Sequence, residues 1–432
     1  MQQTGLDFQQ APPISVPFRF FLTAPVFALL AAVLMLWNAE DLLVSRWSPA
    51  TLAAVHLLTL GFMTMVMAGA MIQMLPVLAG TPVPRPRLVA SVVHPSLLLG
   101  TLLLAGGLLF AQPMWLKIAI LLLGGGLTVF IAATLMILSR ARHRTATVFA
   151  MGLATVALCV TLLLGLTLSA SRAWGIALPN PTLRDLHPAW GLMGWTGLLV
   201  AGVAYHIVPM FQMTPNYPQW MIRGFAPVIF AVLTLWSIAK WQGDAAGWTW
   251  LSLICICLLA GAYSLFAGIT LDLQRRRRRR LPDLTLEFWR VGMLSVVLAA
   301  LLWVSQNFQV LSFRQSGALL GILMILGAAI SFISGMLCKI VPFLAWFHLQ
   351  ARMGGAGAVP NVKTMLPDKA QRLQLRLHQA ALVLCVAAAL RPTVFVYPAA
   401  LCFGAASVSV LWNMIFVVRI YRNFPEGGIQ AA

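Results

Sequence analysis

The sequence predicts an all-α integral membrane protein with twelve transmembrane helices. Of its 432 residues, 60% are hydrophobic and only 9% are charged, and the mean hydropathy is +0.89. No soluble domain can bury that much apolar surface, so the surrounding solvent must be lipid. A helix needs about 20 apolar residues to cross a bilayer, and the chain has such runs near 18–38, 50–75, 91–111, 114–139, 147–171, 187–210, 224–240, 247–271, 289–306, 316–345, 376–391 and 394–418.

The loops between these runs predict the orientation. Twelve spans place both termini on one side of the membrane. If that side is the cytoplasm, it holds all but seven of the 29 Lys and Arg residues, and cytoplasmic loops are the ones enriched in these residues. We therefore expect both termini to be cytoplasmic and the protein to lie in a bacterial inner membrane. The run of six arginines at 275–280 falls in a cytoplasmic loop, which favours contact with anionic lipid headgroups over nucleic-acid binding.

Three of the spans carry the same pattern. The segments at 61–76, 194–209 and 327–342 all fit G-x7-G-x3-[polar]-x2-P, and the interval is 133 residues both from Pro76 to Pro209 and from Pro209 to Pro342. This spacing predicts three four-helix repeats (about 18–139, 147–271 and 289–420) within one membrane domain, 1–432. Each repeat has an even number of helices, so the copies are parallel and related by pseudo-threefold symmetry about an axis along the membrane normal.

The positions that the three segments share predict where these helices lie. Glycines eight residues apart fall on nearly one helix face and allow neighbouring backbones to approach closely, which indicates that the second helix of each repeat is an inner one. The polar position is occupied by Gln73, His206 and Lys339. These three could form a polar ring at the cytoplasmic mouth of the bundle, for which a structural hydrogen-bond network is the simpler account.

Two histidines lie at matching depth in adjacent repeats. His56 precedes Pro76 by 20 residues and His187 precedes Pro209 by 22, so both are near the non-cytoplasmic ends of inner helices. Two facing imidazoles suit axial ligation of one haem iron, and arginines on that side, such as Arg172 and Arg184, could pair with the haem propionates. The alternative is that each histidine is a helix-packing hydrogen-bond donor.

The histidine segments resemble a known superfamily. The stretch "HPAWGLMGW" followed by "TGLLVAGVAYHIVP" (187–209) is similar to a ligand-bearing helix of the catalytic subunit of cbb-type haem-copper oxidases. The segment "HLLTLGF" (56–62) resembles the NnrS-type single-chain haem proteins, which are linked to nitric-oxide and nitrosative stress. The resemblance implies a twelve-helix, pseudo-threefold fold with one haem b held by His56 and His187. It also implies that the protein binds nitric oxide or interacts with a redox partner.

The departures from that superfamily predict what the chain does not do. An oxygen- or nitric-oxide-reducing centre needs a second metal with about three histidines, and the span at 224–240 has no histidine. The other two pockets between repeats would pair Ala189 with Leu320 and Ile322 with Ala54, which cannot ligate iron. We therefore expect one haem, no catalytic residues, and a role in electron transfer or in the response to a gas.

A methionine stripe supports an alternative from another class. Met63, Met67, Met71 and Met74 recur at helical spacing, and thioether sulfur suits Cu(I), although such stripes also serve as flexible packing. The alternative function is a membrane transporter for copper or a small solute. A third alternative is an oxidase-like scaffold without any cofactor.

The remaining features are expected at the cytoplasmic surface. The segment 351–376 is Gly-rich and then basic, and it predicts a cytoplasmic loop that forms a surface helix or a partner site. Four further histidines fall at or near cytoplasmic helix ends, where a surface role is the default: His94, His143, His348 and His378.

Overall fold

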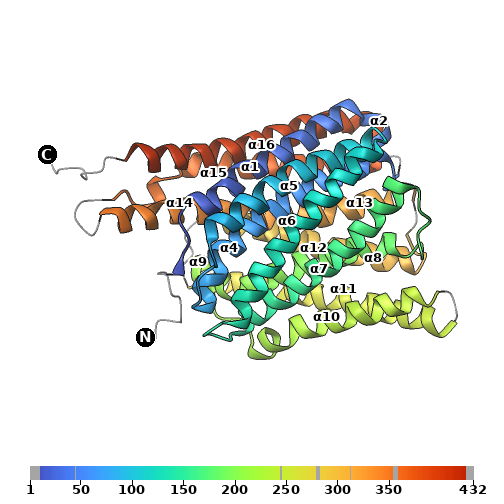
Figure 1. Ribbon diagram of the computed structural model, residues 1–432, viewed down its shortest axis with the longest axis horizontal. Coiled ribbons are helices and arrows are strands. Elements are labelled where there is room, and N and C mark those ends of the chain that lie inside the picture. Colours follow the sequence, from blue (N-terminus) through green and yellow to red (C-terminus); the bar gives the residue numbers. More distant parts are fainter. Residues whose placement is uncertain are drawn as a thin grey trace.

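The computed structural model describes residues 10–43, 45–243, 246–278, 283–311, 313–353 and 359–424. Every regular element in these ranges is a helix, and most of the helices run along the long axis of one bundle (Figure 1). The helix α1 (Ser15–Trp37) begins, and α16 (Pro392–Asn423) ends, at the same end of this bundle. The two helices also pack along one another.

The described residues contain twelve helical spans long and apolar enough to cross a membrane, which confirms the predicted number. Each predicted apolar run falls largely within one of them. Their bounds are Ser15–Trp37, Pro49–Ala79, Pro86–Leu109, Pro113–Ser139, Ala146–Trp174, Leu183–Gln212, Gln219–Trp241, Gly247–Arg275, Leu284–Asn307, Ser316–Met353, Asp368–Leu390 and Pro392–Asn423.

Three of these spans are the inner helices, as the glycine spacing predicts. In Pro49–Ala79, Leu183–Gln212 and Ser316–Met353, 67%, 67% and 72% of the most apolar window is buried, whereas the other nine spans bury between 33% and 50%. A lipid-facing helix buries only the stripe that faces the protein, so the difference separates an inner layer from an outer one.

Each inner span is interrupted by one π-helical segment. The first consists of α3 (Pro49–His56), η2 (Leu57–Thr64) and α4 (Met65–Ala79). The second consists of α8 (Leu183–Ala189), η3 (Trp190–Gly197) and α9 (Leu198–Gln212). The third consists of α13 (Ser316–Ile322), η4 (Leu323–Ile330) and α14 (Ser331–Met353).

The π-helical segments recur at the interval of the sequence pattern. Leu57, Trp190 and Leu323 begin them and lie 133 residues apart. The η2 and η3 segments both contact η4, so the inner spans meet at this level. The recurrence of these segments agrees with the sequence pattern; the four-helix repeats and their pseudo-threefold arrangement remain predictions.

The glycines of the pattern lie against the first helix of their own repeat. These first helices are α1, α7 (Ala146–Trp174) and α12 (Leu284–Asn307). At each glycine an added Cβ would lie less than 3.0 Å from one of their side chains, so a larger residue cannot be accommodated without displacement. The pairs are Gly61 with Phe27, Gly69 with Phe20, Gly194 with Ala157, Gly202 with Ala150, Gly327 with Ser295, and Gly335 with Phe288.

Two predicted surface segments are only partly described. In the arginine run, residues 279–280 lie outside the described residues, while Arg276 pairs with Asp272 at 2.6 Å. The predicted loop 351–376 is shorter than expected, because α14 continues to Met353 and α15 (Asp368–Leu390) has already begun at Asp368. Between them lies the short helix η5 (Val362–Thr364), and residues 354–358 lie outside the described residues.

Candidate functional site

The structure brings His56 and His187 together. Their ring centres are 6.2 Å apart and their planes differ by only 21°. Each residue is partly buried and precedes a π-helical segment of an inner span, His56 as the last residue of α3 and His187 two residues before the end of α8. The two histidines, which the sequence predicts to lie at the same depth, therefore also have adjacent side chains.

The orientation of the His56 ring is set within its own helix. The α3 helix begins after Ser48, whose hydroxyl accepts a hydrogen bond from the backbone N–H of Thr51, and Pro49 occupies the first turn, where its missing N–H is not needed. One turn later, Nδ1 of His56 lies 2.7 Å from the carbonyl oxygen of Leu52. A carbonyl only accepts, so Nδ1 carries the proton and donates it.

The orientation of the His187 ring is set by α7. Its Nδ1 lies 3.1 Å from the carbonyl oxygen of Thr161 and donates to it. One turn along α7, Gly165 leaves room for the ring, because an added Cβ at that position would lie 2.9 Å from Cε1 of His187. Thus a residue of the outer layer fixes a side chain of the inner layer.

These contacts leave both Nε2 atoms with a free lone pair. Neither Nε2 has a hydrogen bond to any described residue. Metal-ligating histidines commonly donate their other ring N–H to a carbonyl, which fixes the tautomer and the ring orientation. A bond of about 2.0 Å from each nitrogen to one shared metal, with the ring radii added, puts the ring centres roughly 6 Å apart, close to the distance observed. The distance between the ring centres therefore matches that of two imidazoles that would hold one haem iron between them.

Charged residues surround the pair at this end of the bundle. The Arg172 guanidinium, at the end of α7, interacts electrostatically with His56 and with Arg184. Arg46, in the segment that leads into α3, forms an ion pair of 3.0 Å with Asp185 in the first turn of α8. That pair is largely exposed, so it stabilises the fold by less than about 1 kcal/mol. It links the segments that carry the two histidines.

The ligand set is too small for a bare metal ion that needs three or four protein ligands. Within the described ranges, no group of three or more His, Cys, Asp and Glu side chains is placed to hold a metal. All six cysteines are free thiols. A porphyrin supplies four of the six ligands of its iron itself, and it needs only two axial side chains from the protein.

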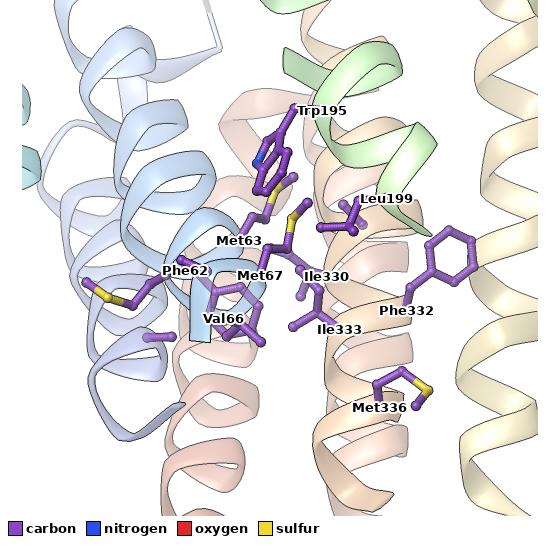
Figure 2. Packing of buried hydrophobic residues seen from close by; sticks show 14 of the residues in the cluster. Phe62, Met63, Val66, Met67, Trp195, Leu199, Ile330, Phe332, Ile333 and Met336 are labelled. Atoms are coloured by element: carbon purple, nitrogen blue, oxygen red, sulfur yellow. The ribbon is translucent and has the colours of Figure 1, made fainter. Parts of the chain in front are cut away.

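A second feature lies on the other side of the π-helical segments. A partly open cavity of about 140 Å³ is lined mainly by α4, α9 and α14, and Met67, Met71 and Met74 of the predicted stripe line it. Met63 does not line the cavity and lies nearer Trp195 (Figure 2). Met336 of α14 faces the same space from the opposite side.

The predicted polar ring is incomplete. Gln73 and His206 line this cavity together, and the Gln73 Oε1 and His206 Nε2 atoms are buried without a hydrogen-bond partner among the described residues. Lys339 does not join them. Its ammonium pairs with Asp283, which caps α12, at 3.3 Å. A long lysine side chain reaches toward the membrane surface to keep its charge near water and an acidic partner.

The expectation that four further histidines have surface roles holds unevenly. His143 is exposed, and His348 is partly buried. His94 is half-buried and lies 2.8 Å from the Thr23 hydroxyl. For His378 the expectation was wrong, because the residue is only 3% exposed and lies 2.7 Å from the Ser331 hydroxyl. Its helix, α15, begins ten residues earlier than the position of His378, so the side chain lies within the bundle rather than at the helix end.

Sequence reasoning missed the residues that position His187. Gly165 and the carbonyl of Thr161 act from a helix of the outer layer, and nothing in the sequence pairs that helix face with position 187. Their four-residue spacing places both on one face of α7, but this signal becomes useful only once the packing is known. The chain matches none of the protein-family models and none of the curated proteins with which it was compared.

Proposed function

We propose that the chain is a haem b protein of a bacterial inner membrane, with both termini in the cytoplasm, and that His56 and His187 are the axial ligands of the iron. The observation that carries the proposal is the pair of nearly parallel imidazoles, 6.2 Å between centres, with both Nδ1 protons donated to carbonyls. The haem group, when bound, would supply a one-electron redox centre.

The role of the chain's own residues follows from this arrangement. Leu52 and Thr161 hold the histidines in the tautomer that offers Nε2 to a metal, and Arg172 and Arg184 provide positive charge for the propionates. Because His56 and His187 together would hold the iron and leave no position open for oxygen, we propose electron transfer, or a response to nitric oxide, rather than reduction of oxygen.

The reduced-minus-oxidised absorption spectrum of the purified protein tests this proposal. We expect a b-type band in the wild type that is lost or strongly shifted in His56→Ala and in His187→Ala. His94→Ala is the matched control, because His94 is a partly buried histidine with a hydroxyl partner on another helix. A wild-type spectrum without a b-type band, or one that both ligand variants leave unchanged, contradicts the proposal and favours the cofactor-free scaffold.

A second candidate function rests on the central cavity. Three methionines of one helix stripe, Met67, Met71 and Met74, line this partly open cavity between the inner spans, and soft thioether ligands suit Cu(I). This arrangement favours a site for copper or a small solute on the way through the bundle.

Cu(I) binding and uptake by vesicles distinguish this candidate from the first. Met67→Leu and Met71→Leu should reduce both, while the haem spectrum remains unchanged. Met114→Leu serves as the control, because Met114 is 65% exposed and lies in α6 (Pro113–Ser139), away from the cavity. Equal copper binding in all three variants rules out the stripe as the site.

A further inference from the structure

A cluster of polar side chains lies within the third repeat, apart from both features described above. Its members come from α14, α15 and α16, and each is at most 4% exposed: Ser331, Ser334, Cys338, Gln374, His378, Ser407 and Asn413. Polar groups in the interior of a membrane protein are costly unless they are satisfied by one another or by water. The cluster therefore needs a full account of its hydrogen bonds.

The Gln374 amide contacts two side chains of the cluster. Its Oε1 accepts from Nδ2 of Asn413 at 2.6 Å and from the Cys338 thiol at 3.6 Å. The oxygen and nitrogen of both amides are assigned from these contacts, and in this assignment both neighbours donate to Gln374. The Nε2 group consequently points elsewhere, and it is buried without a hydrogen-bond partner among the described residues.

Two further groups of the cluster have unused capacity. Ser407 donates its proton to the carbonyl of Phe403 at 2.8 Å, which leaves the lone pairs of its oxygen free. His378 shares a hydrogen bond through Nε2 with Ser331, and its Nδ1 has no partner among the described residues. The cluster thus contains one unpaired donor, on Gln374, and unpaired acceptor sites on the neighbouring helix.

These unused groups border one small cavity. Ser334, Gln374, His378 and Ser407 line it, and its volume is about 10 Å³. A cavity of roughly 10–15 Å³ on this measure accommodates one water molecule, provided that it offers two to four polar partners. Gln374 and His378 are four residues apart on α15 and so face the cavity from one side of that helix.

We propose that Ser334, Gln374, His378 and Ser407 form a binding site for one internal water molecule. The water accepts a hydrogen bond from Nε2 of Gln374 and donates one to Oγ of Ser407, and the Ser334 hydroxyl supplies a third partner. None of the described residues satisfies the Gln374 N–H, whereas water satisfies it without any change of the surrounding packing.

The water would lie beside the His378 imidazole, because the side chain of His378 borders the same cavity. This site does not depend on the haem proposal, because neither His56 nor His187 lines the cavity.

Water-edited nuclear magnetic resonance of protein labelled with ¹⁵N-histidine, in lipid nanodiscs, tests the site. The His378 ring signal is assigned by its loss in His378→Gln. We expect magnetisation to pass from water to this signal in the wild type. A His378 signal that receives none, in protein whose thermal unfolding is normal, shows that the cavity is dry and overturns the proposal.

A cavity-filling variant makes the test specific to this site. Ser407→Val removes the acceptor and occupies the space, so the transfer to His378 should be lost. Thr155→Val is the matched control, because the Thr155 hydroxyl is equally buried and also bonds the carbonyl four residues earlier, on α7. Transfer that persists at the wild-type level in Ser407→Val overturns the proposal. If Ser407→Val fails to fold, Ser334→Val provides the second filling variant, with the same two outcomes.

Discussion

Replacing Gly165 by alanine should weaken haem binding without removing either ligand. The added Cβ would lie 2.9 Å from Cε1 and 3.4 Å from Nδ1 of His187. Carbon atoms in contact are about 3.5–4.0 Å apart, so the ring must withdraw by roughly 0.6–1 Å. The Nδ1–H bond to the Thr161 carbonyl is already 3.1 Å long, and a withdrawal of this size breaks it.

The size of the effect follows from that lost hydrogen bond. A hydrogen bond of this kind contributes about 1 kcal/mol, which corresponds to roughly a fivefold change in affinity. Loss of the partner that orients a metal-ligating histidine typically lowers metal affinity by about 10- to 100-fold. We therefore expect Gly165→Ala to bind haem about 5- to 10-fold more weakly.

The rate of haem transfer to excess apomyoglobin measures this change. Gly268→Ala is the control, because no atom lies within 4 Å of an added Cβ at that position. Both substitutions favour the helix by about 0.5–1 kcal/mol, so the comparison isolates the contact with His187. If Gly165→Ala retains haem as tightly as Gly268→Ala does, the ring is not held by α7 in the way described.

Two further predictions concern stability. In Gly61→Ala the added Cβ would lie 2.3 Å from Cδ1 of the buried Phe27; the melting temperature should fall by the equivalent of about 1–3 kcal/mol, whereas Gly261→Ala, with open space around it, should not lower it. Burial raises the pKa of the Tyr217 hydroxyl, which lies between two spans and bonds Thr270 at 2.9 Å. The contribution of the neutral Tyr217 hydroxyl to the free energy of unfolding is therefore complete below the ordinary tyrosine pKa of about 10. It is lost as the pH rises above that value, because unfolding then allows the hydroxyl to ionise. Tyr217→Phe should lower stability by about 1 kcal/mol at neutral pH and reduce the fall in melting temperature above pH 10; an unchanged pH profile contradicts this account.

Much of the fold could be predicted because lipid imposes simple rules. Each span must be apolar over about 20 residues, and this rule alone gives all twelve. The inner position of three spans followed from glycines eight residues apart, which the structure explains by the side chains of Phe20 and Phe27 that occupy the space beside Gly69 and Gly61. The π-helical segments could not be predicted, because no composition rule marks them.

The part of the candidate site that could be predicted is the position of its histidines along the inner helices. The common spacing placed His56 and His187 at one level, and the structure places their rings side by side. Two expectations failed for different reasons. The Lys339 side chain turns outward to Asp283 rather than joining Gln73 and His206. His378 lies deeper along its helix than expected, because α15 starts before the apolar run that marks it. A sequence position fixes depth along a helix, but packing fixes direction.

The π-helical segments separate two halves of every inner span. His56 and His187 lie before these segments, and the residues that line the central cavity lie after them. A π turn takes up one more residue than an α turn, so deleting one residue from η2 to restore an α-helix would leave the two halves at nearly the same angle. The π-helical segments thus lengthen each inner span by a residue while the histidine end and the cavity end keep the directions that they would have in a continuous α-helix.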